Sequence, residues 1–197
     1  MMETMKQVRV MARHLVALLA VLLAGNSAKA QPAGVRLDTL QVLHIDFQGN
    51  TQKGVIVCNQ QIAGDLRAIF ARLYEAKYPI ERIRPISEYG DDERSMQANN
   101  TSCYCYRPIE GSKKLSNHAR GLAIDINPLY NPCVRRKKDG TLLIQPATGK
   151  PYADRSRTFK YKITTHDLCY QLFTQHGFKW GGSWRSLKDY QHFEKVE

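Results

Sequence analysis

One apolar segment with an aspartate in its middle constrains the fold of this chain more than any other feature. Residues 121–127 read Gly-Leu-Ala-Ile-Asp-Ile-Asn, and a run of this kind predicts a buried strand. Because side chains alternate between the two faces of a strand, the Leu and both Ile would enter a core and Asp125 would face the other way. A buried carboxylate without a partner is costly, so Asp125 needs a group to neutralise it.

Two kinds of partner are possible for Asp125. His118 lies just before the strand, and Gly121 allows the chain to bend sharply between them. A metal ion shared by His118 and Asp125 would satisfy both side chains. The alternative is a structural pair that only holds the loop, formed by Asp125 with His118 or with Arg120.

A second motif near the end of the chain favours the metal. Asp189 stands three residues before His192. A catalytic zinc takes three protein ligands and keeps a fourth position open, so His192 would supply the third ligand. Asp189, close by but not a ligand, could accept a proton from water as general base. Glu194 would share a strand face with His192 and either orient its imidazole or be an ordinary surface carboxylate.

The two motifs together resemble the M15 family of zinc peptidases. The pattern consists of Ser116-x-His118-x-x-Gly121-x-Ala123-x-Asp125 followed far downstream by Asp189-x-x-His192. That family includes D-alanyl-D-alanine carboxypeptidases, the D,D-dipeptidases of vancomycin resistance and the L-alanyl-D-glutamate endopeptidases of phage lysins. The resemblance runs from about Asn99 to Glu194.

The resemblance implies a role for each motif residue. His118, Asp125 and His192 would bind Zn²⁺, and Asp189 would be the general base. Arg107, upstream of the first motif, would stabilise the oxyanion of the tetrahedral intermediate, a role for which Arg120 is the weaker candidate.

Two further residues are candidates for contact with the substrate. Ser116 matches a position that hydrogen-bonds substrate in the family, although its hydroxyl could instead cap a turn. Trp184, in a Gly-Gly-x-Trp loop, would form an apolar wall of the cleft, whereas Trp180 is expected in the core.

The implied activity is hydrolysis of amide bonds in the stem peptides of peptidoglycan. An L-alanyl-D-glutamate endopeptidase and a D-alanyl-D-alanine carboxypeptidase both remain possible, and an Asp at position 189 favours the endopeptidase. The competing class is a catalytically silent, zinc-containing module that binds the cell wall. Asp189 and Arg107 oppose that reading, because a binding module has no use for a base beside the metal.

The beginning of the chain predicts export. Basic residues precede an apolar run, Leu15–Gly25, and Ala28-Lys29-Ala30 then presents small residues where a signal peptidase cuts. A membrane anchor is the alternative, but a span needs roughly twenty apolar residues. We therefore expect a signal peptide over residues 1–30, an M15-like domain over residues 31–197 without stable membrane insertion, and a periplasmic or extracellular location.

The charge of the chain is strongly positive, with 29 Lys and Arg against 18 Asp and Glu. Outside the cytoplasm the available polyanions are envelope polymers, so we expect no nucleic acid as a partner. The densest basic cluster, Arg135–Lys138, is predicted to be a solvated loop before a turn at Asp139 and Gly140.

Five cysteines lie beyond the expected cleavage site, where an oxidising compartment permits disulfides. Cys103, Cys105 and Cys133 depart from what the family resemblance leads us to expect. A disulfide joining the strand of Arg107 to the loop Asn131-Pro132-Cys133 would brace the site.

The pattern of elements predicts a single α+β domain. Strands are expected at 40–47, 54–58, 83–86 and 190–196, helices at 61–78 and 164–173, and a polar loop at 90–93. These elements suggest an antiparallel sheet with helices packed on it and the zinc site on the sheet, in a hedgehog/DD-peptidase-like arrangement.

Overall fold

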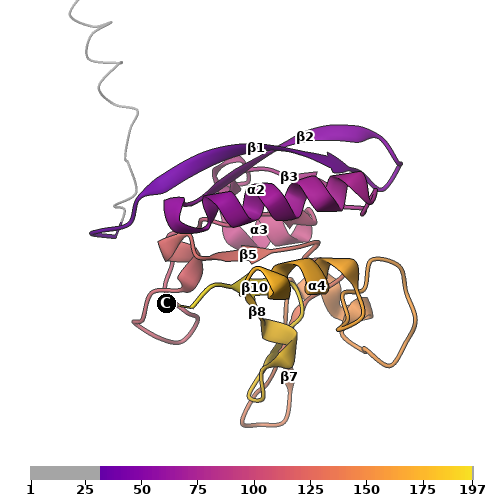
Figure 1. Cartoon of the computed structure of the whole chain (residues 1–197). Coiled ribbons are helices and arrows are strands. Elements are labelled where there is room, and N and C mark those ends of the chain that lie inside the picture. Colours follow the sequence, from indigo (N-terminus) through magenta and orange to yellow (C-terminus); the bar gives the residue numbers. More distant parts are fainter. Residues whose placement is uncertain (1–31, 197) are drawn as a thin grey trace, which may run out of the picture. The chain divides into compact units, whose positions relative to one another are not determined.

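A computed structural model describes residues 32–196, and the signal peptide expected over residues 1–30 lies outside them. Among the described residues no helix is both long and apolar enough to cross a membrane. In chain order the helices and strands are β1 (Leu37–Ile45), β2 (Thr51–Asn59), α2 (Gln60–Glu75), β3 (Arg82–Ile83), α3 (Asp92–Gln97), β4 (Asn100–Thr101), β5 (Ala123–Asp125), β6 (Cys133–Arg136), β7 (Leu142–Gln145), α4 (Leu168–Gln175), β8 (Lys179–Trp180), β9 (Lys188–Asp189) and β10 (His192–Glu194) (Figure 1). Short 3-10 turns stand between them: η1 (Ile86–Glu88), η2 (Asn117–Arg120), η3 (Ala147–Tyr152) and η4 (Gly181–Ser183).

A long antiparallel hairpin and the helix after it form the first part of the fold. β1 and β2 pair along their whole length, from Leu37 opposite Asn59 to Ile45 opposite Thr51. α2 follows without a loop, because the side chain of Asn59 caps it by accepting a hydrogen bond from the backbone N–H of Gln61. The two predicted strands and the predicted helix are confirmed, and the strands are longer than expected.

The helix α2 ends earlier than predicted. Its last residue is Glu75, not Tyr78. Lys77 adopts a left-handed backbone with φ 54°, a conformation that no α-helix continues. Pro79, the predicted helix breaker, therefore lies beyond the actual end.

The core joins α2, α4 and β10 through three phenylalanine rings. Phe70 of α2 meets Phe173 of α4 edge to face, with ring centroids 6.5 Å apart. Phe173 in turn stacks on Phe193 of β10 at 4.4 Å. Trp180 packs against the same core, as predicted. Figure 1 shows α2 running beside the β1–β2 hairpin and α4 beside β8 and β10.

The strands of the described part form four small sheets. Three are antiparallel, with orders β1-β2, β5-β10-β8 and β7-β6-β9, and the pair β3-β4 is parallel. An α+β domain with antiparallel sheets is thus confirmed. Where we predicted an antiparallel sheet, the described strands divide into these four small sheets.

One predicted loop and the start of one predicted helix are wrong. The segment Gly90–Glu93, predicted as a polar loop, leads into α3, with Asp91 as its N-cap. The helix predicted from Thr164 begins at Leu168 instead, because Asp167 rather than Thr164 is the N-cap residue.

Three other segments differ in length from the prediction. The strand expected at 83–86 is the two-residue β3, and η1 follows it. The last strand, expected at 190–196, is the three-residue β10. The cluster Arg135–Lys138 is only partly a loop, because its two arginines belong to β6 and only its two lysines lead into the turn.

The predicted disulfide is wrong, because none of the five cysteines, all of which lie within residues 32–196, forms a disulfide. The thiol of Cys103 donates a hydrogen bond to the backbone oxygen of Gly121 at 3.4 Å. Cys133 lies in β6 directly opposite Asp189 of β9, far along the chain from the strand of Arg107. Both are buried and pack as small hydrophobic side chains.

Candidate metal centre

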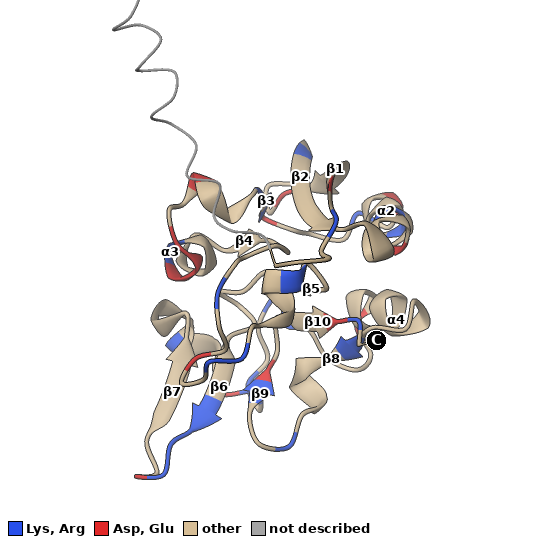
Figure 2. Cartoon of the chain, turned by 90° about the vertical axis from the view of Figure 1, so that its left-hand side faces the viewer, with Lys and Arg blue, Asp and Glu red and all other residues tan. Residues whose placement is uncertain are grey.

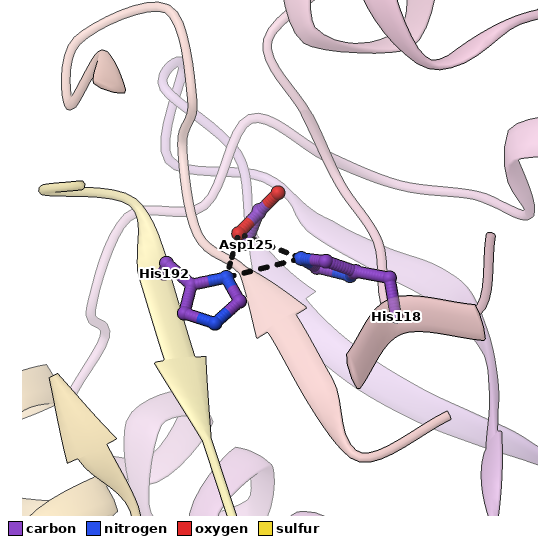
Figure 3. Close-up of side chains that lie close together, drawn as sticks. All are labelled: His118, Asp125 and His192. Atoms are coloured by element: carbon purple, nitrogen blue, oxygen red, sulfur yellow. Dashed lines mark hydrogen bonds and ion pairs between the residues drawn. The ribbon is translucent and has the colours of Figure 1, made fainter. Parts of the chain in front are cut away.

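Two neighbouring strands and a short turn bring three polar side chains together (Figure 3). β5 and β10 are antiparallel, and their register sets Asp125 directly opposite His192. His118 comes from η2, the turn that precedes β5. Gly121 ends this turn with φ 67°, and a Cβ there would lie 2.6 Å from the backbone nitrogen of Asn59. Both the left-handed backbone and the close approach require glycine at this bend.

The donor atoms of these side chains form a nearly equilateral triangle. Nε2 of His118 lies 3.1 Å from Nδ1 of His192, and Oδ1 of Asp125 lies 3.3 Å from the former and 3.2 Å from the latter. For a tetrahedral zinc with bonds of about 2.0–2.1 Å, neighbouring ligand atoms stand about 3.4 Å apart. The three side chains are therefore spaced so that they could hold a metal ion.

The outer nitrogen of each imidazole is already engaged. Nδ1 of His118 lies 2.7 Å from the backbone oxygen of Cys103, and Nε2 of His192 lies 3.3 Å from Oε2 of Glu194. These contacts assign a hydrogen to each outer nitrogen and leave the lone pairs of the inner nitrogens facing the carboxylate of Asp125. Three electron-rich atoms repel one another unless a proton or a metal ion lies between them. Two imidazoles and one carboxylate are a donor set that suits zinc.

The electrostatics of the site also favour an added positive charge. His118, Asp125 and His192 are only 3, 4 and 5% exposed. Burial by itself raises the pKa of Asp125, but the two histidines outweigh it and hold this pKa below its ordinary range. Burial lowers the pKa of His192, but hydrogen bonds to Asp125 and Glu194 outweigh burial and raise it to about 10.

A cavity of about 570 Å³ opens beside these three residues. Its lining includes every residue to which the sequence assigned a role: Arg107, Ser116, His118, Asp125, Trp184, Asp189 and His192. Arg120, the alternative electrophile, is exposed and is not part of the lining.

Asp189 reaches the cavity from β9. Its Oδ1 is buried and has no hydrogen-bond partner within residues 32–196. Burial raises the pKa of Asp189 to about 6, and Asp125 adds to this rise while His192 opposes it. A carboxylate with a free oxygen and a raised pKa beside a candidate metal site is suited to accept a proton.

Arg107 is held in the cavity by a carboxylate that the sequence did not reveal. Its Nε lies 2.6 Å from Oδ2 of Asp92, an ion pair that lacks the angle of a directed hydrogen bond. Burial raises the pKa of Asp92, although Arg107 opposes the rise. Asp92 was assigned to a loop, and no spacing in the sequence relates it to Arg107.

Ser116 and Trp184 lie on the cavity wall close to the histidines. The hydroxyl of Ser116 accepts a hydrogen bond from the backbone N–H of His118 at 3.2 Å, so it caps η2 as well as lining the cavity. The ring of Trp184 stands 5.1 Å from that of His192.

Among the other lining residues that the sequence analysis missed are Asn117, Cys133 and Arg135. Asn117 donates a hydrogen bond to Oε2 of Glu194 at 2.5 Å, and its place inside the first motif could have drawn attention to it. Cys133 and Arg135 reach the cavity only because β6 pairs with β9, a pairing between distant segments that no local pattern announces.

Comparison with known proteins agrees with the motifs. A family model described as D-alanyl-D-alanine carboxypeptidase matches residues 110–195, which contain both motifs. Neither a curated protein nor a solved structure matches the chain. The match over residues 110–195 thus supports the M15 family of peptidases, which the motifs of the chain resemble.

Proposed function

We propose that this protein is a zinc peptidase that hydrolyses amide bonds in the stem peptides of peptidoglycan, as an L-alanyl-D-glutamate endopeptidase or a D-alanyl-D-alanine carboxypeptidase. The observation that carries the proposal is the triangle of His118, Asp125 and His192 at a cavity that also contains Asp189. The family match supports a peptidase that acts on cell-wall peptides.

The three residues of the triangle would hold the zinc and leave its cavity side open. Bound zinc would polarise the scissile carbonyl and make a nearby water more acidic. Glu194 and the backbone oxygen of Cys103 would keep the two imidazoles in the orientation that this requires.

The remaining residues would divide the proton transfers and the charge stabilisation between them. Asp189 would accept a proton from the attacking water at its free Oδ1 and then pass it to the leaving amine. Arg107, kept in place by Asp92, would donate to the developing oxyanion. Trp184 would shield this chemistry from solvent, and Ser116 would hydrogen-bond the substrate.

The cellular setting is part of the proposal. Residues 1–30 would be a signal peptide, residues 31–197 an M15-like domain of hedgehog/DD-peptidase-like arrangement, and the mature protein periplasmic or extracellular. The apolar run Leu15–Gly25 and the small residues after it support export.

Product masses from purified muropeptides test the proposal. Loss of one D-alanine would identify a carboxypeptidase, and separation after L-alanine an endopeptidase. A chelator should stop either reaction and zinc should restore it. A protein that binds zinc and muropeptides but releases no product would instead be the silent wall-binding module.

A further inference from the structure

Arg135 is a cation in the cavity whose charge is not engaged by the rest of the described chain. Within residues 32–196 no hydrogen bond or ion pair joins its guanidinium to another residue. Arg107, by contrast, is paired with Asp92, and Lys114 lies exposed in a loop. Arg135 is half-buried on β6, where a free guanidinium is partly desolvated and gains most from a bound anion.

The strand register places Arg135 close to the reaction centre. Cys133 stands opposite Asp189 on one side of β6 and opposite Gln145 on the other, and all three line the cavity. Residues two apart on a strand share a face, about 6.6 Å from each other. Arg135 therefore stands on the cavity face one repeat beyond the row that contains Asp189. Figure 2 shows the basic part of β6 leading into the hairpin loop.

Three carboxylates of the cavity have partners other than Arg135: Asp92 contacts Arg107, Glu93 contacts Gln97 and the backbone of Ala147, and Glu194 contacts Asn117 and His192. Asp125 lies against the two histidines of the triangle, and neither Glu110 nor Asp189 forms an ion pair with Arg135 within residues 32–196. The guanidinium of Arg135 is therefore available to an anionic ligand. A guanidinium fork matches a carboxylate with two parallel hydrogen bonds.

The two bonds named in the proposed function share a feature that fits this fork. In both, the residue that supplies the leaving amine carries a free α-carboxylate. It is the terminal D-alanine in one case, and in the other the D-glutamate, whose chain continues through its side-chain carboxyl group. We infer that Arg135 binds this α-carboxylate and so selects the bond that is cleaved. The inference rests on the proposed function, because it names the substrate group that the same site recognises.

Matched peptides test the inference. In the first arm, zinc-loaded protein is given a peptide that ends in D-alanyl-D-alanine or the same peptide with a terminal amide. In the second arm it is given a muropeptide that contains D-glutamate or the same muropeptide with D-isoglutamine in its place. The arm that is cleaved identifies the source of the carboxylate. In that arm kcat/KM should be roughly 10- to 100-fold higher for the carboxylate than for the amide, through KM rather than kcat.

The variant Arg135→Gln keeps a long polar side chain but removes the charge. It should lower kcat/KM for the carboxylate to the level of the amide and leave the amide unchanged. Arg136→Gln is the matched control, because Arg136 is the next residue of β6, exposed and bonded to the backbone of Gly140. Equal losses on both substrates, or a wild-type protein indifferent to amidation, would overturn the inference.

A binding measurement separates this inference from the proposed function. Calorimetric titration with D-alanyl-D-alanine, with L-alanyl-D-glutamate and with the α-amide of each requires no turnover. If no peptide is cleaved, the proposed function fails. Tighter binding of the acid than of the amide, lost in Arg135→Gln, would still establish that Arg135 binds the α-carboxylate. Equal affinity for acid and amide would reject it. Zinc content and melting temperature, measured on each variant, show whether the fold and metal are retained.

Discussion

At the scale of single residues, we expect each of His118, Asp125 and His192 to be required for the metal. His118→Ala, Asp125→Ala and His192→Ala should each lose the zinc, because a site with three protein ligands cannot spare one. Metal analysis of each purified variant decides the matter. Glu194→Gln is the control, since Glu194 contacts His192 at its outer nitrogen rather than at the nitrogen that faces Asp125, and its loss should weaken zinc binding without abolishing it. Full zinc retention in any alanine variant would remove that residue from the ligand set.

Asp189 can be separated from the metal by a change that preserves its shape. Asp189→Asn should keep the fold and the zinc yet lower kcat by about 10² to 10⁴-fold, the usual contribution of a general base. A base works only when deprotonated, so the wild-type rate should fall as pH drops through about 6, the pKa of Asp189. Bound zinc would lower this pKa, and the fall in rate would then begin at a lower pH. Activity and melting temperature are measured on one preparation. A variant with normal rates and reduced stability would mean that Asp189 only supports the strand pairing.

The role of Arg107 is tested by replacing it with lysine. Arg107→Lys keeps the charge but not the forked donors, so kcat should fall roughly 10² to 10³-fold while KM moves little. Arg120→Lys should be far milder, because Arg120 is exposed and outside the cavity. Steady-state kinetics of the two variants side by side give the comparison. The reverse order of effects would make Arg120 the electrophile.

At the scale of elements, the bend between η2 and β5 sets the distance from His118 to Asp125. Gly121→Ala should destabilise the protein, because φ 67° strains an alanine and its Cβ would collide with the backbone of Asn59. Gly64→Ala should do the opposite. Gly64 lies in α2 with open space around it, so alanine there should add about 0.5–1 kcal/mol. Thermal unfolding of both variants, with zinc analysis of the first, checks the pair.

The elements also differ in how far the sequence could predict the positions of the site residues. His118, Asp125 and the bend between them lie within one short segment, so spacing alone placed them together. The ion pair of Arg107 with Asp92 depends on where a short helix packs, which no local pattern encodes. Local rules also compete: Thr164 and Asp167 are both good N-caps. Asp167 is the cap in the structure, where its carboxylate also accepts a hydrogen bond from the hydroxyl of Tyr78.

At the scale of the whole described domain, one short strand belongs to both the core and the candidate metal centre. Phe193 of β10 is fully buried and stacks on Phe173, while His192 and Glu194 on either side of it face the candidate centre. This alternation was predicted from the period of two along a strand. Because the same three residues serve packing and chemistry, the position of the ligand is fixed by the core. Metal binding should in turn stabilise the fold.

Removal of the metal tests that coupling. A cation that binds only the folded state stabilises it by about 4 kcal/mol when its concentration is 1,000 times Kd. For a domain of this size such a gain raises Tm on the order of 10 °C. Chelated protein should remain folded, because the phenylalanine core does not depend on the metal, but it should melt at the lower temperature and recover on addition of zinc. His118→Ala should melt at one temperature with or without zinc. If zinc raises the Tm of this variant as much as that of the wild type, the stabilising ion is bound elsewhere than at the triangle of His118, Asp125 and His192.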